Sequence, residues 1–229
     1  MADYQSEEEQ IEAFKQWWVD NGLKLVAAAV IAIGGTLGWQ GWQGSQQEHA
    51  QEGSAIYSAM IDIVTTETDK QLSEEQLQQI TASADQLKQQ YGDSGYAQLS
   101  ALLKAKLAVD ADNLDQAASE LEWVLNNDPA DDLKLLATLR LARVESARGN
   151  ADKALAMLEG QDAGKMTSAF EEAKGDFHIS LGHYEAAYSS YQTAIDTEES
   201  GNSRQLSILR LKMSQAKPAS EEVETQGDS

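Results

Sequence analysis

The chain has 229 residues, and its 38 acidic against 17 basic residues give a net charge of −21 that would repel phosphates and excludes nucleic-acid binding through the overall field. It contains no cysteine, which excludes disulfides and thiolate metal sites. A chain of this length is enough for one domain with a sizeable core, even if part of it forms a membrane segment.

The first predicted element is an amphipathic helix in a short acidic tail. Phe14, Trp17 and Trp18 fall on one face at helical spacing, and Asn21-Gly22 offers a break before the next element. We expect residues 1–22 to be this tail, with the helix lying in the cytoplasmic interface of a membrane. The alternative is that the same face contacts a protein.

An apolar run then predicts a transmembrane helix over residues 23–43. The run extends from Leu25 to Trp39, and no charged residue stands between Lys24 and Glu48. At about 1.5 Å of rise per residue, such a helix crosses roughly 30 Å of hydrocarbon. Four of the five tryptophans flank it on both sides, which is typical of membrane interfaces. A buried core helix is the alternative, but it would not usually be so long, uncharged and bracketed by Trp.

The basic residues near the run predict its orientation. Lys15 and Lys24 lie on the N-terminal side, whereas the first basic residue on the other side is Lys70. The tail should therefore stay in the cytoplasm and the rest of the chain should cross. Because the tail is acidic and the run ends in bulky Trp residues, we expect a retained anchor rather than a cleaved signal peptide.

Inside the predicted anchor, Gly34 and Gly38 form a GxxxG motif. This spacing lets another helix approach closely, which matters in lipid because no hydrophobic effect drives helices together there. We single out these two glycines as a candidate packing face. The alternative is that glycine is simply common in membrane helices.

Helical periodicity is continuous beyond the anchor, and no strand pattern competes with it. The sequence therefore predicts nine helices joined by short loops over residues 44–215. Residues 216–229 hold almost no apolar residue, and we expect them to form a disordered acidic tail.

Three segments of this domain align with one another around their turns, which are Asp112-Asn113, Gly149-Asn150 and Gly182-His183. The aligned positions are Ala105, Ala142 and Gly175 in a first helix, Ala117, Ala154 and Ala187 in a second helix, and Leu121, Leu158 and Tyr191 four residues later. Small residues let two antiparallel helices pack closely, and the larger residue fills the gap to the next pair. The pattern is typical of tetratricopeptide repeats. The predicted fold class is all-α, with an N-terminal single transmembrane helix followed by a tetratricopeptide repeat-like α-solenoid.

Two arginines on the first helix of the middle repeat are candidate partner-binding residues. Stacked helix pairs leave a concave face, and Arg140 and Arg143 can donate there to carbonyls or carboxylates of a partner. The alternative, which we favour, is that they pair with neighbouring acids such as Glu145 or Asp132.

Nothing in the sequence predicts catalysis, a metal site or a cofactor. Of the three histidines, His178 and His183 are five residues apart in a helix and a turn, so we expect them not to share a face as metal ligands would. No nucleophile, metal-ligand or phosphate-binding motif appears. We expect a binding protein rather than an enzyme.

The order of these parts resembles the YfgM family, the ancillary SecYEG translocon subunits of Gram-negative bacteria. The resemblance runs from Phe14-Lys15-Gln16-Trp17-Trp18 through the stretch 139–144 and into the turn at 149–155, and it covers most of residues 4–213. The acidic extension after Met213 is longer than the family pattern.

The resemblance implies a single-pass protein of the bacterial inner membrane, with its N-terminus in the cytoplasm and its repeat domain in the periplasm. It further implies three kinds of partner besides membrane lipid: the SecYEG translocon, a PpiD-like periplasmic prolyl isomerase, and unfolded exported polypeptides handled in a chaperone-like way. The alternative is a membrane-tethered regulatory or assembly scaffold that is not bound to the translocon.

Overall fold

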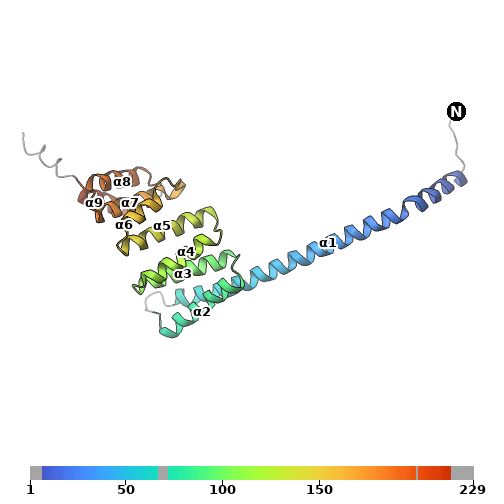
Figure 1. Ribbon diagram of the computed structural model, residues 1–229, viewed down its shortest axis with the longest axis horizontal. Coiled ribbons are helices and arrows are strands. Elements are labelled where there is room, and N and C mark those ends of the chain that lie inside the picture. The colour runs from blue at the N-terminus through green and yellow to red at the C-terminus, as the bar shows by residue number, and fades with distance from the viewer. Residues whose placement is uncertain (1–6, 67–71, 200, 218–229) are drawn as a thin grey trace, which may run out of the picture. The chain divides into compact units, whose positions relative to one another are not determined.

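The computed structural model describes residues 7–66, 72–199 and 201–217, and for residues 7–9, 25, 26, 29 and 41–49 it describes the backbone alone. Within these residues the regular elements are all helical, which confirms the all-α prediction (Figure 1). In chain order they are α1 (Glu7–Thr66), α2 (Glu74–Gln90), α3 (Gly95–Asp110), α4 (Leu114–Asn126), α5 (Asp131–Ala147), α6 (Ala151–Leu158), the short 3-10 helix η1 (Gly164–Met166), α7 (Thr167–Ser180), α8 (Tyr184–Asp196) and α9 (Ser203–Gln215).

Helix α1 is continuous through the point where the sequence predicts a break. At Asn21 the side-chain amide donates to the backbone carbonyl of Trp17 at 3.1 Å, a bond within the helix rather than a cap. At Gly22 the missing side chain makes room for the indole of Trp18, to which a Cβ would come within 3.2 Å. The predicted break at Asn21-Gly22 is therefore wrong, because both residues serve interactions inside the helix.

The chain divides into two compact units, and the division falls inside α1, between Glu52 and Gly53. In the first unit, the predicted transmembrane segment 23–43 lies on α1, and its described side chains such as Ile31 and Leu37 are exposed. Among the described residues no helix is both long enough and apolar enough to span a membrane. The transmembrane helix stays a prediction.

The second unit begins with the end of α1, which packs with α2. Met60 of α1 and Ile80 and Leu87 of α2 are fully buried in one core cluster. The start of α2 is fixed by a capping box, in which Gln76 N–H donates to the Ser73 hydroxyl and Ser73 N–H donates to the Gln76 side chain. This pair of helices covers one end of the repeats.

The repeats are three successive helix pairs, α3–α4, α5–α6 and α7–α8, and α9 packs against the last one. Each helix contacts mainly its neighbours in the sequence, which is the property of a solenoid (Figure 1). The turn inside each pair passes through a left-handed residue, with φ of 57° at Asp112, 87° at Gly149 and 76° at Gly182. Glycine adopts this conformation without strain in two of the repeats, and aspartate adopts it in the first.

The aligned repeat positions lie inside the helix pairs. All nine are buried in the described core: Ala105, Ala117, Leu121, Ala142, Ala154, Leu158, Gly175, Ala187 and Tyr191. Sizes at two of these positions are matched within each repeat. In the first two repeats the second helix has a leucine, Leu121 or Leu158, and the first helix has an alanine. In the third repeat the second helix has the larger Tyr191 and the first helix has Gly175. A Cβ on that glycine would lie 2.5 Å from the tyrosine ring.

Replacing Gly175 with Ala should therefore destabilise the protein by about 1–3 kcal/mol, because the added methyl group overpacks the site beneath Tyr191. Thermal melting of the full chain measures the loss. The same change in a Tyr191→Leu background should cost far less, since alanine with leucine is the combination of the other two repeats. Equal losses in both backgrounds would show that the two positions are not coupled.

Candidate functional site

A groove of about 370 Å³ opens between the first helices of two neighbouring repeats. We call it the α3–α5 groove. Its lining consists of Ala105, Lys106 and Val109 from α3, Leu114 and Leu121 from α4, and Arg140, Arg143, Val144 and Ala147 from α5. Six of these nine residues are apolar, and the volume lies in the range of ligand pockets. The groove therefore combines an apolar interior with a few charged groups.

Both candidate arginines are in this lining and both are exposed. They lie three residues apart on α5, which places them next to each other on the helix surface. Among the described residues neither of them forms an ion pair, so the pairing with Glu145 or Asp132 that we favoured from the sequence is wrong. The reason is that Glu145 points into the core, where other groups bind it.

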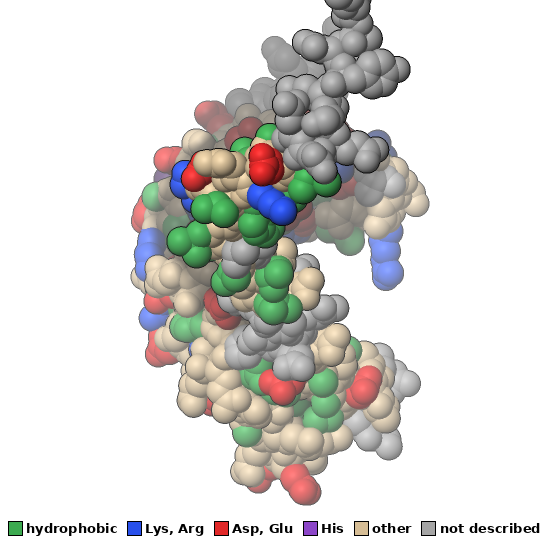
Figure 2. Space-filling model, turned by 90° about the vertical axis from the view of Figure 1, so that its right-hand side faces the viewer, with side chains coloured by type: hydrophobic (Ala, Val, Ile, Leu, Met, Phe, Trp, Pro, Cys, Tyr) green, Lys and Arg blue, Asp and Glu red, His purple; other side chains and the backbone are tan. Residues whose placement is uncertain are grey.

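The charge of the groove differs from that of the chain. All three ionisable lining residues are cationic, and the third, Lys106, pairs with Asp110 one turn further along α3. On the face that Figure 2 shows, acidic side chains are scattered among hydrophobic and basic ones rather than gathered in one block. A cationic rim around an apolar interior suits a ligand that carries both carboxylates and apolar groups.

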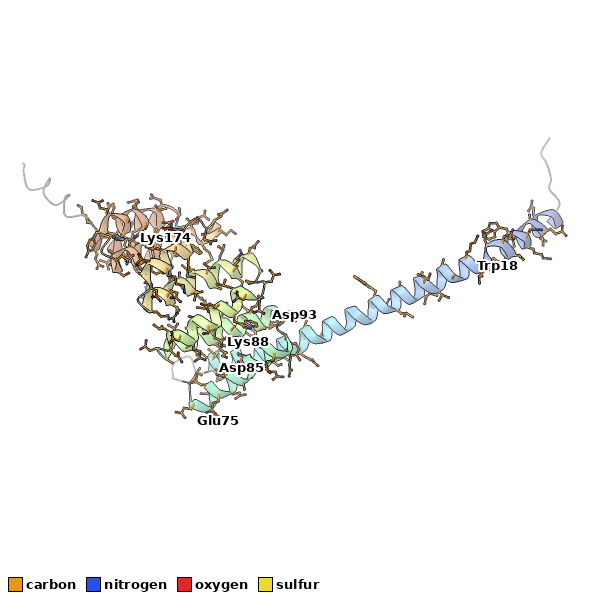
Figure 3. The ribbon with its side chains drawn as sticks, in the orientation of Figure 1. Trp18, Glu75, Asp85, Lys88, Asp93 and Lys174 are labelled. Carbon is orange, nitrogen blue, oxygen red and sulfur yellow. The ribbon has the colours of Figure 1, made fainter. Side chains whose placement is uncertain are left out.

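A buried ionic network fixes α3 against α2 and α4 beside the groove. The Nζ atom of Lys104 lies 2.7 Å from carboxylate oxygens of Asp85 and of Glu120. The other oxygen of Glu120 accepts from Lys88 at 2.7 Å, and Lys88 also lies over the ring of Trp123 at 4.7 Å. Figure 3 labels Asp85 and Lys88 on α2. Burial by itself lowers the pKa of Lys104, but the two carboxylates outweigh it and raise that pKa.

A second buried carboxylate fixes the turn after α5. Glu145 is fully buried, accepts from Arg148 at 2.6 Å and from the Asn150 amide at 2.7 Å, and lies 3.2 Å from Lys153. Burial favours the neutral acid, yet these donors outweigh it and lower the pKa of Glu145. Arg148 also reaches Asp115 of α4 at 2.7 Å, so the turn is tied to the preceding repeat.

The family of the chain follows from its repeats. A family model described as a tetratricopeptide repeat-like domain matches residues 15–217. The chain belongs to this tetratricopeptide repeat-like family. It is 27% identical over 207 residues to a protein of Haemophilus influenzae named "Ancillary SecYEG translocon subunit", covering 90% of this chain and 96% of the relative. A protein of the same name from Escherichia coli K12 is 27% identical over 201 residues, covering 86% and 91%.

These relatives confirm the resemblance to the ancillary translocon subunits. A solved structure, of a thermophilic TPR protein from Thermus thermophilus, is 17% identical with a TM-score of 0.45 and covers 74% of this chain and 97% of that one. The family is a repeat scaffold for protein interactions, and the relatives are named as translocon subunits. The chain is thus a tetratricopeptide repeat-like scaffold and not an enzyme.

Two histidines of the third repeat lie closer together than expected. The rings of His178 and His183 are 5.8 Å apart between centroids, because the turn after α7 closes with a bond from His183 N–H to the His178 carbonyl at 2.9 Å. Burial, followed by the charges of His183 and Lys174, lowers the pKa of His178. In the described part of the chain no group of three or more metal-ligating side chains comes together, at these histidines or elsewhere.

The first unit carries the other candidate residues. Phe14, Trp17 and Trp18 are exposed on α1, and the Phe14 ring lies 6.1 Å from that of Trp17 and 6.4 Å from that of Trp18. Figure 3 labels Trp18 on this helix. At Gly34 and Gly38 an added Cβ would meet no other atom within 4 Å. Within this unit both faces are open to a partner.

The two arginines could be identified from the sequence, but the other residues that line the groove could not. Lys106, Val109 and Leu114 join the groove only through the packing of three helices, which no local pattern reveals. The buried acids did leave a signal. Glu120 stands beside Leu121 on the apolar face of α4, and Glu145 stands beside Val144 on that of α5. An acid in an apolar stripe predicts a buried ion pair.

Proposed function

We propose that this protein is an accessory subunit of the SecYEG translocon, in which the tetratricopeptide repeats act as an adaptor for other proteins. The observation that carries the proposal is the match to relatives named as ancillary SecYEG translocon subunits along 86–90% of the chain. The match includes the N-terminal helix as well as the repeats, so it covers the order of parts and not the repeat fold alone.

In this proposal the chain has four parts. Residues 1–22 form a cytoplasmic tail, residues 23–43 a transmembrane anchor, residues 44–215 the periplasmic repeat domain and residues 216–229 an acidic tail. Support for the anchor comes from the uncharged apolar run and its flanking tryptophans, and support for the orientation comes from the lysines before the run. The exposed aromatic side chains near Trp18 would then lie among lipid headgroups.

Recruitment in this proposal uses two surfaces. The open face at Gly34 and Gly38 would pack against a transmembrane helix of the translocon or of a PpiD-like prolyl isomerase. The repeat domain would contact periplasmic partners and unfolded exported polypeptides in a chaperone-like way, since the solenoid presents a groove with an apolar interior.

Topology and co-purification test the proposal together. Alkaline phosphatase fused after residue 229 should be active, because it needs the oxidising side of the membrane. The full chain, tagged at its C-terminus and extracted in mild detergent, should recover the SecYEG subunits. If the fusion is active but the translocon is not recovered, the alternative of a membrane-tethered scaffold not bound to the translocon is favoured. If the fusion is inactive while a cytoplasmic reporter at the same position works, the predicted orientation is wrong.

A separate experiment tests the candidate packing face at Gly34 and Gly38. Replacing Gly34 and Gly38 with Leu keeps the segment apolar, so insertion should be unchanged while translocon recovery falls. Exchange of residues 23–43 for an unrelated single-span helix of the same orientation is the stronger variant. Full recovery of partners after this exchange would place all recruitment in the repeats.

A further inference from the structure

The charges of the α3–α5 groove run against the composition of the chain. Acidic residues outnumber basic ones by 38 to 17, yet every ionisable residue in the lining is a cation. Lys106 has an acidic neighbour in Asp110, but among the described residues Arg140 and Arg143 have no ion-pair partner. Arg140 and Arg143 thus lie three residues apart on α5, exposed and with no carboxylate of the described chain paired to them.

The interior of the groove supplies the second half of the argument. Leu121 is buried at its base, whereas Val109, 44% exposed, stands at the open side. An apolar side chain entering between them would leave water for a site that is already lined by hydrocarbon, which favours binding. The groove therefore offers an apolar contribution from α3 and α4 and an ionic contribution from two arginines within about one turn of α5.

We propose that the α3–α5 groove binds an acidic peptide segment of a partner protein, whose apolar side chains enter the groove while its carboxylates pair with Arg140 and Arg143. The planar guanidinium fork matches a carboxylate with two parallel hydrogen bonds. A basic peptide meets like charge at the rim, and a long polyanion such as nucleic acid meets the net charge of −21. A short acidic segment meets opposite charge at the rim, and it feels less of the net charge than a long polyanion does, because salt screens charges beyond a Debye length of about 8 Å. The inference rests on the proposed function only in that the repeats contact partner proteins.

Binding of designed peptides to the full chain in lipid nanodiscs tests this, with empty nanodiscs as the blank. The probe is a fluorescent peptide in which leucine alternates with glutamate, measured by fluorescence anisotropy. Its two controls carry lysine in place of glutamate, or serine in place of leucine. We expect binding of the first peptide alone, with each control at least about tenfold weaker, a difference of about 1.4 kcal/mol. Equal binding of the lysine peptide would overturn the ionic half, and equal binding of the serine peptide the apolar half.

A matched pair of double variants locates the site. Arg140→Ala with Arg143→Ala should weaken the glutamate–leucine peptide at least about tenfold. Arg204→Ala with Arg210→Ala removes the same charge from exposed positions on α9, outside the groove, and should change the affinity less than twofold. Equal weakening by the two variants would mean that the peptide senses only the overall charge, which would overturn the site.

The acidic C-terminal residues of the chain itself are the competing occupant. They include Glu221, Glu222 and Glu224 around Val223. A chain that ends at Lys217 should bind the peptide as the full chain does. Binding to the shortened chain alone would assign the groove to the protein's own end and overturn a partner segment. Translocon recovery, measured in parallel, separates the two proposals. If the peptide does not bind while translocon recovery is intact, this inference is wrong and the proposed function is unaffected.

Discussion

Replacing Ala187 with Asp should lower the free energy of unfolding by roughly 3 kcal/mol or more, the largest loss that we expect from a single change in the third repeat. Ala187 is fully buried on α8, in a cluster with Tyr191, Ala216, Ile179 and Met213. These neighbours offer hydrocarbon and aromatic surface, so the introduced carboxyl group must either stay protonated or push α8 away from α7. Thermal melting of the full chain, followed by far-UV circular dichroism, measures the effect.

Two control variants separate this effect from a general loss. Ser189→Asp places the same charge on the exposed side of the same helix and should stay within about 0.5 kcal/mol of the parent. Arg143→Ala removes an exposed side chain and should cost about 0–1 kcal/mol. Similar melting temperatures for Ala187→Asp and Ser189→Asp would show that the register of the third repeat is misassigned.

The repeats could be predicted from the sequence because their packing depends on residue size at fixed spacing. Small residues at helix crossings and glycine in a left-handed turn are local requirements, so they appear in the alignment of three segments. The matching of Gly175 to Tyr191 was visible in the same alignment, as the one repeat that combines the smallest residue with the largest. Three-dimensional packing added the reason, which is the ring lying over the glycine.

The continuity of α1 could not be predicted in the same way. Asn-Gly is a common helix end, since both residues tolerate left-handed backbone and leave few helix-stabilising contacts. Here the amide of Asn21 binds a carbonyl one turn back and Gly22 receives the indole of Trp18, so the helical conformation satisfies both residues. A turn signal is overridden when a large side chain one turn earlier needs the space.

The groove was reachable from the sequence only in part. Arg140 and Arg143 were conspicuous as basic residues in an acidic chain, but nearness in the sequence suggested the wrong partners. Glu145 belongs to the buried side of α5, and Arg148 and Asn150 follow it closely enough to satisfy its carboxylate. Which side of the helix an acid occupies decides its partners, and that depends on the helices packed around it.

The buried network at Glu120 is where we expect the second large effect. Glu120→Leu should lower the free energy of unfolding by about 3 kcal/mol, because removing one member of a buried ion pair strands the other. The stranded cation is Lys104, whose side chain is 8% exposed and would keep only Asp85. Lys88 is less affected, since its side chain is 17% exposed and also lies over Trp123. Urea denaturation of the full chain measures the loss.

The double variant Lys104→Met with Glu120→Leu decides whether the network adds net stability to the fold or only offsets the cost of burying its own charges. Well-packed apolar residues in place of a buried ion pair are often neutral in stability, because the cost of desolvating both charges disappears with them. We therefore expect the double variant to lie within about 1 kcal/mol of the parent, well above Glu120→Leu alone, with a coupling energy of at least about 2 kcal/mol in the double-mutant cycle. A double variant that loses the sum of the two single losses would show that each charge is held independently, by Asp85 on one side and Lys88 on the other.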